Sequence, residues 1–459
     1  MITRREALAG AALFTTAGAS SATAGGSFRA TGAESAKLFT ADSRIKPATF
    51  DRLPLAWNKA RMKALQTRLA AKGLEGILLT DPWNIIYYTG LYTTVTERLL
   101  HAFIPTGGTH PIWFYPRLER ELVETWWFED GDAYFDVPNV AGSAPQDGKL
   151  VRGETQDVWR WALEGLKTRG FAGKKLAADR FLSPSAQQTT HAVLGAPFAS
   201  AEEDCLYLRL RKTPEELELT RRAYIYLDRI HAFVRDLVLT RGTDLTDFEV
   251  GMAAKQFGTE LIMADVKPNG ELHQAVGIHV DVMCHAGKTT GYGHPNQFLY
   301  SRIERGKPLQ FAALLQIGGC GGELYRPYMI APRTQHMEKL WSVSRDCCLL
   351  ERDLLRKGAR CSDIAWAIHQ EQIKRGVQQY VYNRPAHGQG MEGHQPPYIA
   401  LGDHSLLDTG MCLSAEPALF DPQNGVGVNF SDMFVVEPEG PPLQMSRLPW
   451  SEEWAWIKL

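Results

Sequence analysis

The sequence predicts an α+β protein in which an N-terminal α/β domain precedes a domain of long helices and strands. Residues 53 to about 201 alternate helical segments with short apolar strands, which is the pattern of an α/β domain. After residue 205 the order changes to two long helices, a run of strands, a second helix pair at about 334–357 and 362–375, and further strands. We therefore expect one domain over residues 53–205 and a second over residues 206–459.

Capping signals mark helix ends in both halves. Residues 57–73 form an amphipathic pattern that stops at Gly73 and leads into an apolar strand. In the second half, Thr213 is followed by Pro-Glu-Glu, so a capping threonine precedes a proline at the first helical position and a glutamate three residues after the cap. This predicts a helix over residues 214–239, and a second helix after Thr246.

The first residues have the organisation of a signal peptide. Arg4 and Arg5 precede an apolar stretch that is too short to span a bilayer, and small residues up to Ala24 resemble a cleavage site. We expect residues 1–24 to be a twin-arginine signal that directs the folded protein to a bacterial periplasm. A disordered cytosolic leader is the alternative. Residues 25–52 are rich in Gly, Ala, Ser and Thr and are expected to be a linker.

The composition limits the possible partners. The chain has 459 residues, 44% of them hydrophobic and 22% charged, with a formal net charge of −2. Such a balance provides no basic field for a nucleic acid, and no segment is apolar over the ~18 residues that a transmembrane helix needs. Its seven cysteines are odd in number and show no CxxC spacing, so neither a disulfide framework nor a zinc knuckle is expected. A small-molecule substrate is the expected partner.

Three motifs in a fixed order resemble one superfamily. They are Asp81-Pro-Trp-Asn-Ile-Ile-Tyr-Tyr-Thr-Gly90, Leu210-Arg-Lys-Thr-Pro-Glu-Glu-Leu217, and His387-Gly-Gln-Gly-Met-Glu-Gly-His394 followed by Ala415-Glu416-Pro417. Together they are similar to motifs of the creatinase, prolidase and aminopeptidase P superfamily. The resemblance implies a pita-bread catalytic domain over residues 206–459, a creatinase-type α/β domain over residues 53–205, and a homodimer.

The resemblance also exposes a gap in the metal ligands. Metal-dependent members use Asp, Asp, His, Glu and Glu around two divalent ions. Alignment on Gly319 and Arg326 places these five positions at Ala312, Glu323, His387, Glu416 and Ser431. Two carboxylates are therefore replaced by residues that cannot bridge two cations. We expect no dinuclear site and no cofactor; the alternative is a single divalent ion on Glu323, His387 and Glu416.

Creatinase-like members, which work without metal, share the spacing from Gly287 to His294. That likeness implies that His294 is the general acid/base and that His387 and Glu416 are also catalytic. Residues expected to bind substrate are Glu323, Tyr325, Arg326, His394 and Asp432. Three alternatives stay open: His285 could replace His294, His394 could orient His387, and Arg326 could form a structural ion pair with Asp432 or Glu323.

Three functions follow, in order of preference. The first is a metal-independent, creatinase-like hydrolase that splits a C–N or similar bond in a small polar substrate, with His294 moving the proton while Glu416 and Glu323 hold the substrate. The second is a lyase or hydrolase with one metal ion on Glu323, His387 and Glu416. The third is an exported pseudoenzyme that only binds a ligand. Dinuclear peptidase activity ranks below all three.

Overall fold

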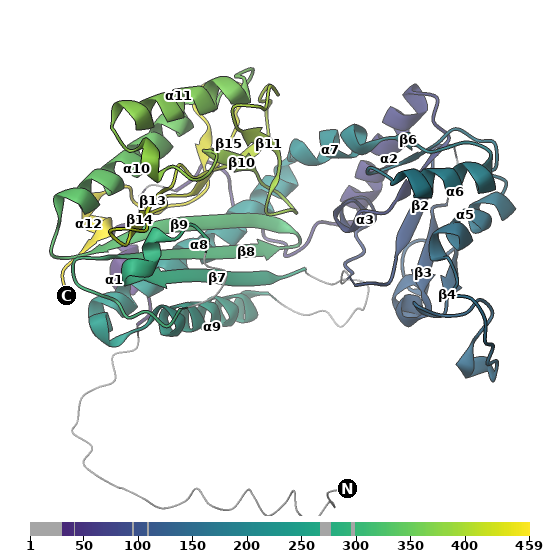
Figure 1. The fold of residues 1–459 in the computed structure, drawn as a ribbon, viewed down its shortest axis with the longest axis horizontal. Helices are drawn as coiled ribbons and strands as arrows, with labels where there is room; N and C mark the ends of the chain where they lie inside the picture. The colour runs from purple at the N-terminus through teal and green to yellow at the C-terminus, as the bar shows by residue number, and fades with distance from the viewer. Residues whose placement is uncertain (1–29, 41, 94–95, 108–109, 267–276, 295–298) are drawn as a thin grey trace, which may run out of the picture.

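The computed structural model describes residues 30–40, 42–93, 96–107, 110–266, 277–294 and 299–459. The predicted signal peptide, residues 1–24, lies outside these residues. Two domains lie side by side, with the N-terminal one purple to teal and most of the second teal to yellow (Figure 1). The predicted α+β architecture is confirmed.

The N-terminal domain is a six-stranded sheet with helices on both faces. Along β1 (Gly76–Leu79), Ile77 and Leu79 enter a core shared with α2 and α3, whereas Leu78 enters a second core with α5 and α6. This alternation is what a strand buried on both faces requires. The strand order is β4-β3-β2-β1-β5-β6, and β1 is antiparallel to β2 and parallel to β5.

The remaining elements of this domain have the following bounds. Its strands are β2 (His101–Pro105), β3 (Ile112–Pro116), β4 (Gly131–Tyr134), β5 (Leu176–Ala178) and β6 (Ala199–Ser200). Its helices are α2 (Leu55–Ala71), α3 (Pro82–Thr89), α4 (Arg120–Glu124), α5 (Val158–Thr168), α6 (Pro184–Leu194) and α7 (Glu202–Leu210).

The second domain encloses two sheets between helix pairs. On one side, α8 (Pro214–Arg241) and α9 (Asp247–Asp265) cover the sheet β17-β9-β8-β7. On the other, α10 (Gln335–Leu354) and α11 (Cys361–Lys374) lie against the sheet β11-β10-β12-β15-β16 (Figure 1). This is the expected pita-bread arrangement.

Strands of the first sheet are β7 (His279–Ala286), β8 (Pro308–Ile317), β9 (Cys320–Ile330) and β17 (Trp456–Ile457). Those of the second are β10 (Ala386–Gly388), β11 (Gln395–Ile399), β12 (Cys412–Ala415), β15 (Asp432–Val435) and β16 (Leu443–Gln444). A separate hairpin joins β13 (Leu419–Asp421) to β14 (Val426–Val428), and α12 is Glu452–Ala455.

Helix α8 begins with the predicted capping box. The Thr213 hydroxyl accepts the Glu216 amide at 3.4 Å, and the Glu216 carboxylate accepts the Thr213 amide at 2.9 Å. The short helix α1 (Ala33–Ala36) packs on α8, where the Ser35 hydroxyl donates to Asp236 at 2.6 Å. The described part of the predicted linker is therefore attached to the second domain.

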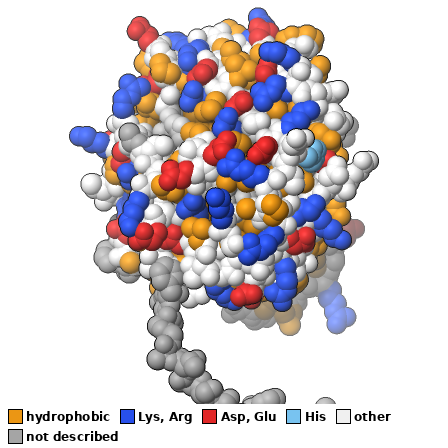
Figure 2. Space-filling model, turned by 90° about the vertical axis from the view of Figure 1, so that its left-hand side faces the viewer, with side chains coloured by type: hydrophobic (Ala, Val, Ile, Leu, Met, Phe, Trp, Pro, Cys, Tyr) orange, Lys and Arg blue, Asp and Glu red, His pale blue; other side chains and the backbone are white. Residues whose placement is uncertain are grey.

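The surface charges, the cysteines and the helices agree with the expectations from composition. Figure 2 shows acidic and basic side chains interspersed on one face of the second domain. All seven cysteines are free and buried. Among the described residues, no helix combines the length and the apolarity that a membrane span needs.

Candidate metal centre

Four side chains converge where the two sheets of the second domain meet. Glu323 lies on β9, His387 on β10, His394 just before β11, and Glu416 just after β12. One potential ligand atom from each of them lies within 4.8 Å of all the others. The elements come together because β10 lies between β11 and β12 and pairs with both, so the strand carrying His387 is flanked by the segments carrying His394 and Glu416.

His387 is the centre of this cluster. Its Nε2 lies 2.9 Å from Glu323 Oε1 and 3.1 Å from Glu416 Oε1, and its Nδ1 is 3.1 Å from the Gly388 carbonyl oxygen. The ring of His394 stands at 77° to that of His387, with 4.1 Å between centroids. One imidazole therefore bridges two carboxylates, and the second imidazole packs against it.

The electrostatics show a buried excess of negative charge. Burial alone would lower the pKa of His387, but hydrogen bonds and charge from Glu323 and Glu416 outweigh it and raise that pKa to about 10. Burial and the charge of Glu323 raise the pKa of Glu416, while burial and the charge of His387 lower the pKa of His394. Two carboxylates thus share one imidazolium, and a proton on His387 balances part of their charge.

A divalent cation fits this donor set. Glu323 Oε1 and His387 Nε2 are buried, and among the described residues their polar contacts are with members of the cluster itself, His387 Nε2 with Glu323 and Glu416. Buried charged atoms of this kind are costly unless they are paired or coordinate a metal. Two carboxylates and two imidazoles also suit divalent transition metals such as Mn²⁺ or Zn²⁺.

The two replaced positions lie beside the cluster and carry no carboxylate. Ala312 pairs with Tyr325 in the β8–β9 register, just as Leu314 pairs with Glu323, so Ala312 shares a face with Glu323. The Ser431 hydroxyl is buried and lies 2.8 Å from the hydroxyl of Ser414, which also hydrogen-bonds to Glu323. The donor set therefore fits one cation better than two, because these positions provide no carboxylate to neutralise a second cation.

Other predicted site residues lie outside the four-donor cluster. His294 is exposed and follows the 3-10 turn Gly287–Gly291. Tyr325 shares the strand face of Glu323, but its hydroxyl points to the Met283 sulfur, 3.9 Å away. His285 is buried on β7.

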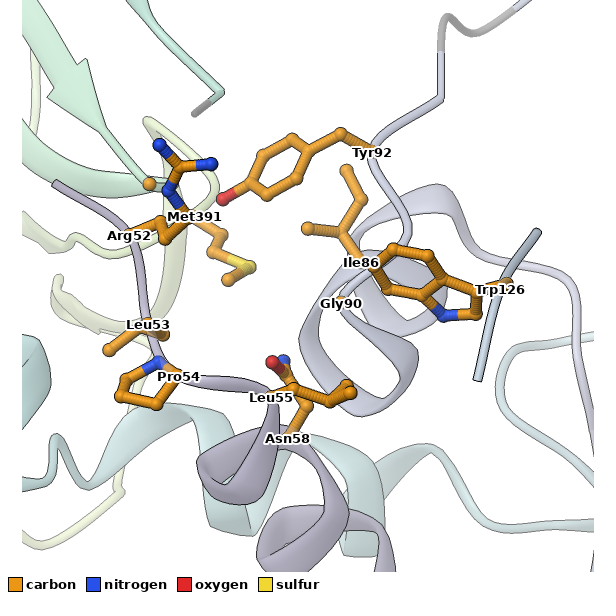
Figure 3. A pocket seen from close by; sticks show the side chains of 11 residues that line it. Arg52, Leu53, Pro54, Leu55, Asn58, Ile86, Gly90, Tyr92, Trp126 and Met391 are labelled. Carbon is orange, nitrogen blue, oxygen red and sulfur yellow. The ribbon is translucent and has the colours of Figure 1, made fainter. Parts of the chain in front are cut away.

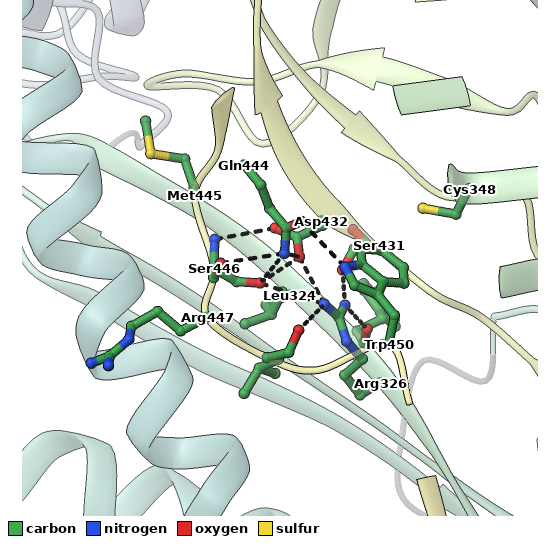
Figure 4. A network of polar contacts seen from close by, with 12 residues as sticks. Leu324, Arg326, Cys348, Ser431, Asp432, Gln444, Met445, Ser446, Arg447 and Trp450 are labelled. Atoms are coloured by element: carbon green, nitrogen blue, oxygen red, sulfur yellow. Dashed lines mark hydrogen bonds and ion pairs between the residues drawn. The ribbon is translucent and has the colours of Figure 1, made fainter. Parts of the chain in front are cut away.

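Arg326 and Asp432 form a separate buried network (Figure 4). Arg326 donates to Asp432 at 2.7 Å, to the Ser431 carbonyl at 2.7 Å and to the Tyr325 carbonyl at 2.9 Å. Asp432 also accepts from Gln444 and from the hydroxyl of Ser446. Arg326 therefore forms the structural ion pair with Asp432 that the sequence allowed as an alternative. This pair links β9 to β15 next to Ser431.

Sequence reasoning missed two buried polar groups near the cluster. Gln389 is 1% exposed, and its Oε1 has no hydrogen-bond partner among the described residues. Glu351 on α10 is fully buried; burial, and then the charge of Glu416, raise its pKa well above the ordinary value. Gln389 stands inside the quoted His387 motif, so a polar residue between its two glycines was the available signal.

A cavity between the domains is lined by Gly322, Gln389 and Gly393, which are close in sequence to members of the cluster. Its volume is about 350 Å³, and its walls come from α3 and from the β8, β9 and β10–β11 segments. A neighbouring cavity of about 250 Å³ shares Ile86, Tyr92 and Met391 with it (Figure 3). Arg209 holds the domains together here, because it donates to Asn84 on α3 at 2.9 Å and to Glu392 in the β10–β11 turn at 2.7 Å.

Comparisons with known proteins agree with this arrangement. The family profile described as Creatinase/Prolidase N-terminal domain matches residues 61–168, and the one described as Metallopeptidase family M24 matches residues 219–438. An Xaa-Pro dipeptidase of Lactobacillus delbrueckii subsp. lactis is 23% identical, over 82% of this chain and 94% of that protein.

Solved structures share the fold. Dipeptidase PepE from Mycobacterium ulcerans has a TM-score of 0.69 at 20% identity and covers 89% of this chain and 100% of its own. A prolidase from Thermococcus sibiricus has a TM-score of 0.69 at 18% identity and covers 88% of this chain and 99% of its own.

The fold and the site thus define a pita-bread protein with a creatinase-type N-terminal domain. The chain belongs to the creatinase, prolidase and aminopeptidase P superfamily, and these likenesses support a hydrolase.

Two expectations are wrong. The comparisons point to metal-dependent dipeptidases and not to a metal-independent creatinase-like enzyme, and the expected absence of a cofactor is overturned with it. The physical reason is that the loss of two carboxylates leaves a closely spaced donor set intact. His394, which was expected to bind substrate, contributes its fourth member.

Proposed function

We propose that this chain is a metal-dependent dipeptidase that holds one divalent cation on Glu323, His387, His394 and Glu416. The observation that carries the proposal is the convergence of four donor atoms within 4.8 Å, with Glu323 and His387 buried, Glu416 half-buried and His394 exposed. The dipeptidase and prolidase relatives support the substrate class. A cation in this position would supply Lewis-acid activation of a peptide carbonyl and of a water nucleophile.

The protein's own residues would prepare that chemistry in three ways. The hydroxyl of Ser414 hydrogen-bonds to Glu323 and so orients one of the anionic donors. The carbonyl of Gly388 lies 3.1 Å from Nδ1 of His387 and fixes the ring so that Nε2 faces the carboxylates. The cavity lined by Gly322, Gln389 and Gly393 offers a partly enclosed space for a short peptide.

The test is metal content and turnover in the same sample. Purified protein is loaded with Mn²⁺, Co²⁺ or Zn²⁺, freed of excess ion and assayed by mass spectrometry and with a panel of dipeptides that includes Xaa-Pro sequences. We expect about one equivalent of metal, release of free amino acids, and loss of turnover on chelation with recovery on adding metal back. Turnover that is unchanged after complete metal removal would overturn the proposal, and so would metal-loaded protein that cleaves no dipeptide.

We also propose that residues 1–24 direct export and that the mature chain is a homodimer. Replacing Arg4 and Arg5 by lysine should leave the protein in the cytoplasmic fraction of a bacterial host, whereas the unchanged chain should reach the periplasm with a new N-terminus near residue 25. Light scattering after size exclusion should give twice the mass of the mature chain. Cytoplasmic retention of the unchanged chain, or a monomer mass, would contradict the respective proposal.

A further inference from the structure

The N-terminal domain has a crevice of its own at one edge of its sheet. The neighbouring strands β1 and β5 are parallel, and the helices that follow them lie on opposite faces of the sheet. Helix α3 packs on the core that contains Ile77 and Leu79, whereas α6 packs on the core that contains Leu78. In open α/β sheets, ligands bind in the crevice at the carboxyl ends of strands where the helices change face in this way. The carboxyl ends of β1 and β5 therefore form the crevice in which a ligand of this domain is expected.

A cavity of about 310 Å³ lies at this edge. In its wall, Thr80 follows β1, His101 begins β2, and Trp159 comes from α5. Arg180 and Phe181 also line it, from the short connection between β5 and α6. A second cavity of about 300 Å³ is lined by the same two residues, so this connection separates two hollows. The cavity therefore combines polar, charged and aromatic side chains at the strand ends.

The backbone around the cavity is held by hydrogen bonds. The buried Asp179 carboxylate accepts from the amide and from the hydroxyl of Thr80, each at 2.9 Å, and so joins the end of β5 to the end of β1. The Ser183 hydroxyl accepts the Ala186 amide at 3.2 Å and caps α6. The connection that carries Arg180 is thus fixed at both ends. A preformed cavity lowers the entropy cost of binding.

A buried histidine in the wall lacks the partners that its chemistry requires. His101 is 3% exposed, and neither ring nitrogen makes a hydrogen bond of ordinary geometry to a described residue. The backbone of Leu100 is a weak partner for the ring and can serve only one of the two nitrogens. Burial, and then the charge of Arg180, lower the pKa of His101 to about 4, so the guanidinium lies near this ring. Because buried polar groups are normally hydrogen-bonded, at least one nitrogen is left for a molecule in the cavity.

An arginine and two aromatic rings complete the lining. Arg180 is exposed and makes no ion pair with a described residue. A guanidinium presents a planar fork of N–H donors that fits a carboxylate or a phosphate. The Trp159 ring stands at 86° to that of His101, and its Nε1 donates to the Ala186 carbonyl at 3.2 Å, which fixes it. Phe181 is 80% exposed, so a ligand that covers its ring gains from burial of apolar surface.

We propose that this cavity binds a small aromatic anion. The carboxylate or phosphate of the ligand pairs with Arg180, and its ring packs against Trp159 and Phe181. His101 makes one hydrogen bond to a polar atom of the same molecule. The proposal goes beyond the dipeptidase function, because the cavity shares no residue with the donor cluster.

The first test measures binding to the full-length protein by calorimetry. Phenyl phosphate and phenylacetate are aromatic anions, inorganic phosphate and acetate are anions without a ring, and 2-phenylethanol is a ring without charge. We expect about one equivalent of an aromatic anion to bind, roughly tenfold or more tighter than the matching anion without a ring and than 2-phenylethanol. Binding of phenyl phosphate alone would assign the cavity to phosphates, and binding of phenylacetate alone would assign it to carboxylates.

The second test locates the site. Arg180→Gln should weaken binding of the aromatic anion by roughly tenfold or more, because it removes the charge at an exposed position. The matched control is Arg160→Gln, since Arg160 is an exposed arginine next to Trp159 that does not line the cavity; its affinity should change less than about twofold.

The third test concerns the buried histidine. His101→Leu should weaken binding by roughly fivefold, because it removes the hydrogen bond to the ligand. The unfolding temperature of the ligand-free variant should stay the same or rise, since a buried polar group without an adequate partner is replaced by an apolar one. Full affinity in His101→Leu would remove His101 from the site.

Several results would overturn the proposal itself. They are the absence of binding by both aromatic anions, equal affinity for 2-phenylethanol or for the anions without a ring, and unchanged affinity in Arg180→Gln. Affinity should also be the same with and without Mn²⁺, because the donor cluster is not part of the cavity. Binding that requires the metal would place the anion at the donor cluster and would equally overturn the proposal. The dipeptidase proposal depends on none of these results.

Discussion

Two buried groups of charges lie close together in the second domain, and they differ in how well they are paired. Arg326 and Asp432 are fully buried, and each makes several hydrogen bonds to its surroundings. In the donor cluster, two carboxylates share one imidazole, because the single atom His387 Nε2 lies 2.9 Å from Glu323 and 3.1 Å from Glu416.

This difference separates a structural charge pair from a site that awaits a ligand. A buried ion pair with additional hydrogen bonds contributes to one rigid arrangement, although it need not exceed an apolar replacement in stability. A buried cluster with surplus negative charge has a different property, because binding of a cation lowers the free energy of the folded protein. Both groups are held by β9, so the first fixes the backbone on which the second depends.

The largest effect is expected from breaking the paired group. Arg326→Met leaves Asp432 buried without its cation and should lower the free energy of unfolding by about 3–5 kcal/mol. Chemical denaturation of the metal-free protein measures it. The control is Arg333→Met, which breaks an ion pair to Glu452 whose side chains are 43% and 56% exposed, and it should cost less than about 1 kcal/mol. Similar losses for both variants would mean that the buried pair has no special structural role.

The next largest effect is expected in the donor cluster, where two carboxylates share one imidazole. His387→Ala removes the side chain that contacts both carboxylates and should weaken Mn²⁺ or Zn²⁺ binding at least a hundredfold, more than the roughly 10–100-fold typical of residues that only support a ligand. Calorimetric titration gives the affinity. His404→Ala is the matched control, since His404 is exposed. Unchanged metal affinity in His387→Ala would place the cation elsewhere.

The fold was more predictable than the site because its signals are local. The capping box at Thr213 and the amphipathic pattern that became α2 depend on residues a few positions apart. The packing of α1 on α8 joins Ser35 to Asp236, a contact that no composition rule for residues 25–52 could supply.

The donor set was predicted in part. His387, Glu416 and Glu323 follow from motif positions, and the structure brings all three together. His394 joins them because of how the β10–β11 turn folds back, and His294 comes close enough to His394 for its charge to lower the pKa of His394, although it is not one of the four donors. Neither placement can be read from residue spacing. The replacement of two carboxylates at Ala312 and Ser431 also does not reveal how close to one another the remaining donors lie.

The pH dependence of metal binding sharpens the contrast further. The pKa of His387 is raised from 6.5 to about 10, so at neutral pH a cation must displace its proton. Raising the pH toward 10 removes that competition, and metal affinity should therefore increase roughly tenfold per pH unit between pH 7 and 9. Calorimetry in buffers of different ionisation enthalpy should detect about one proton released per ion. An affinity that does not change with pH would show that His387 binds no proton in the metal-free protein.

The smallest effect is expected at Ser431, which belongs to both groups. Its carbonyl accepts from Arg326, while its hydroxyl lies 2.8 Å from Ser414 at the position where relatives with two ions would offer a carboxylate. Ser431→Ala keeps the carbonyl and removes one hydrogen bond, so the free energy of unfolding should fall by only about 1 kcal/mol. Metal affinity should stay within threefold, because Ser414 still supports Glu323. A tenfold loss of affinity would instead mean that the hydroxyl is itself a metal ligand. Ser431 would then contribute its side chain to the metal site and its carbonyl to the Arg326 network.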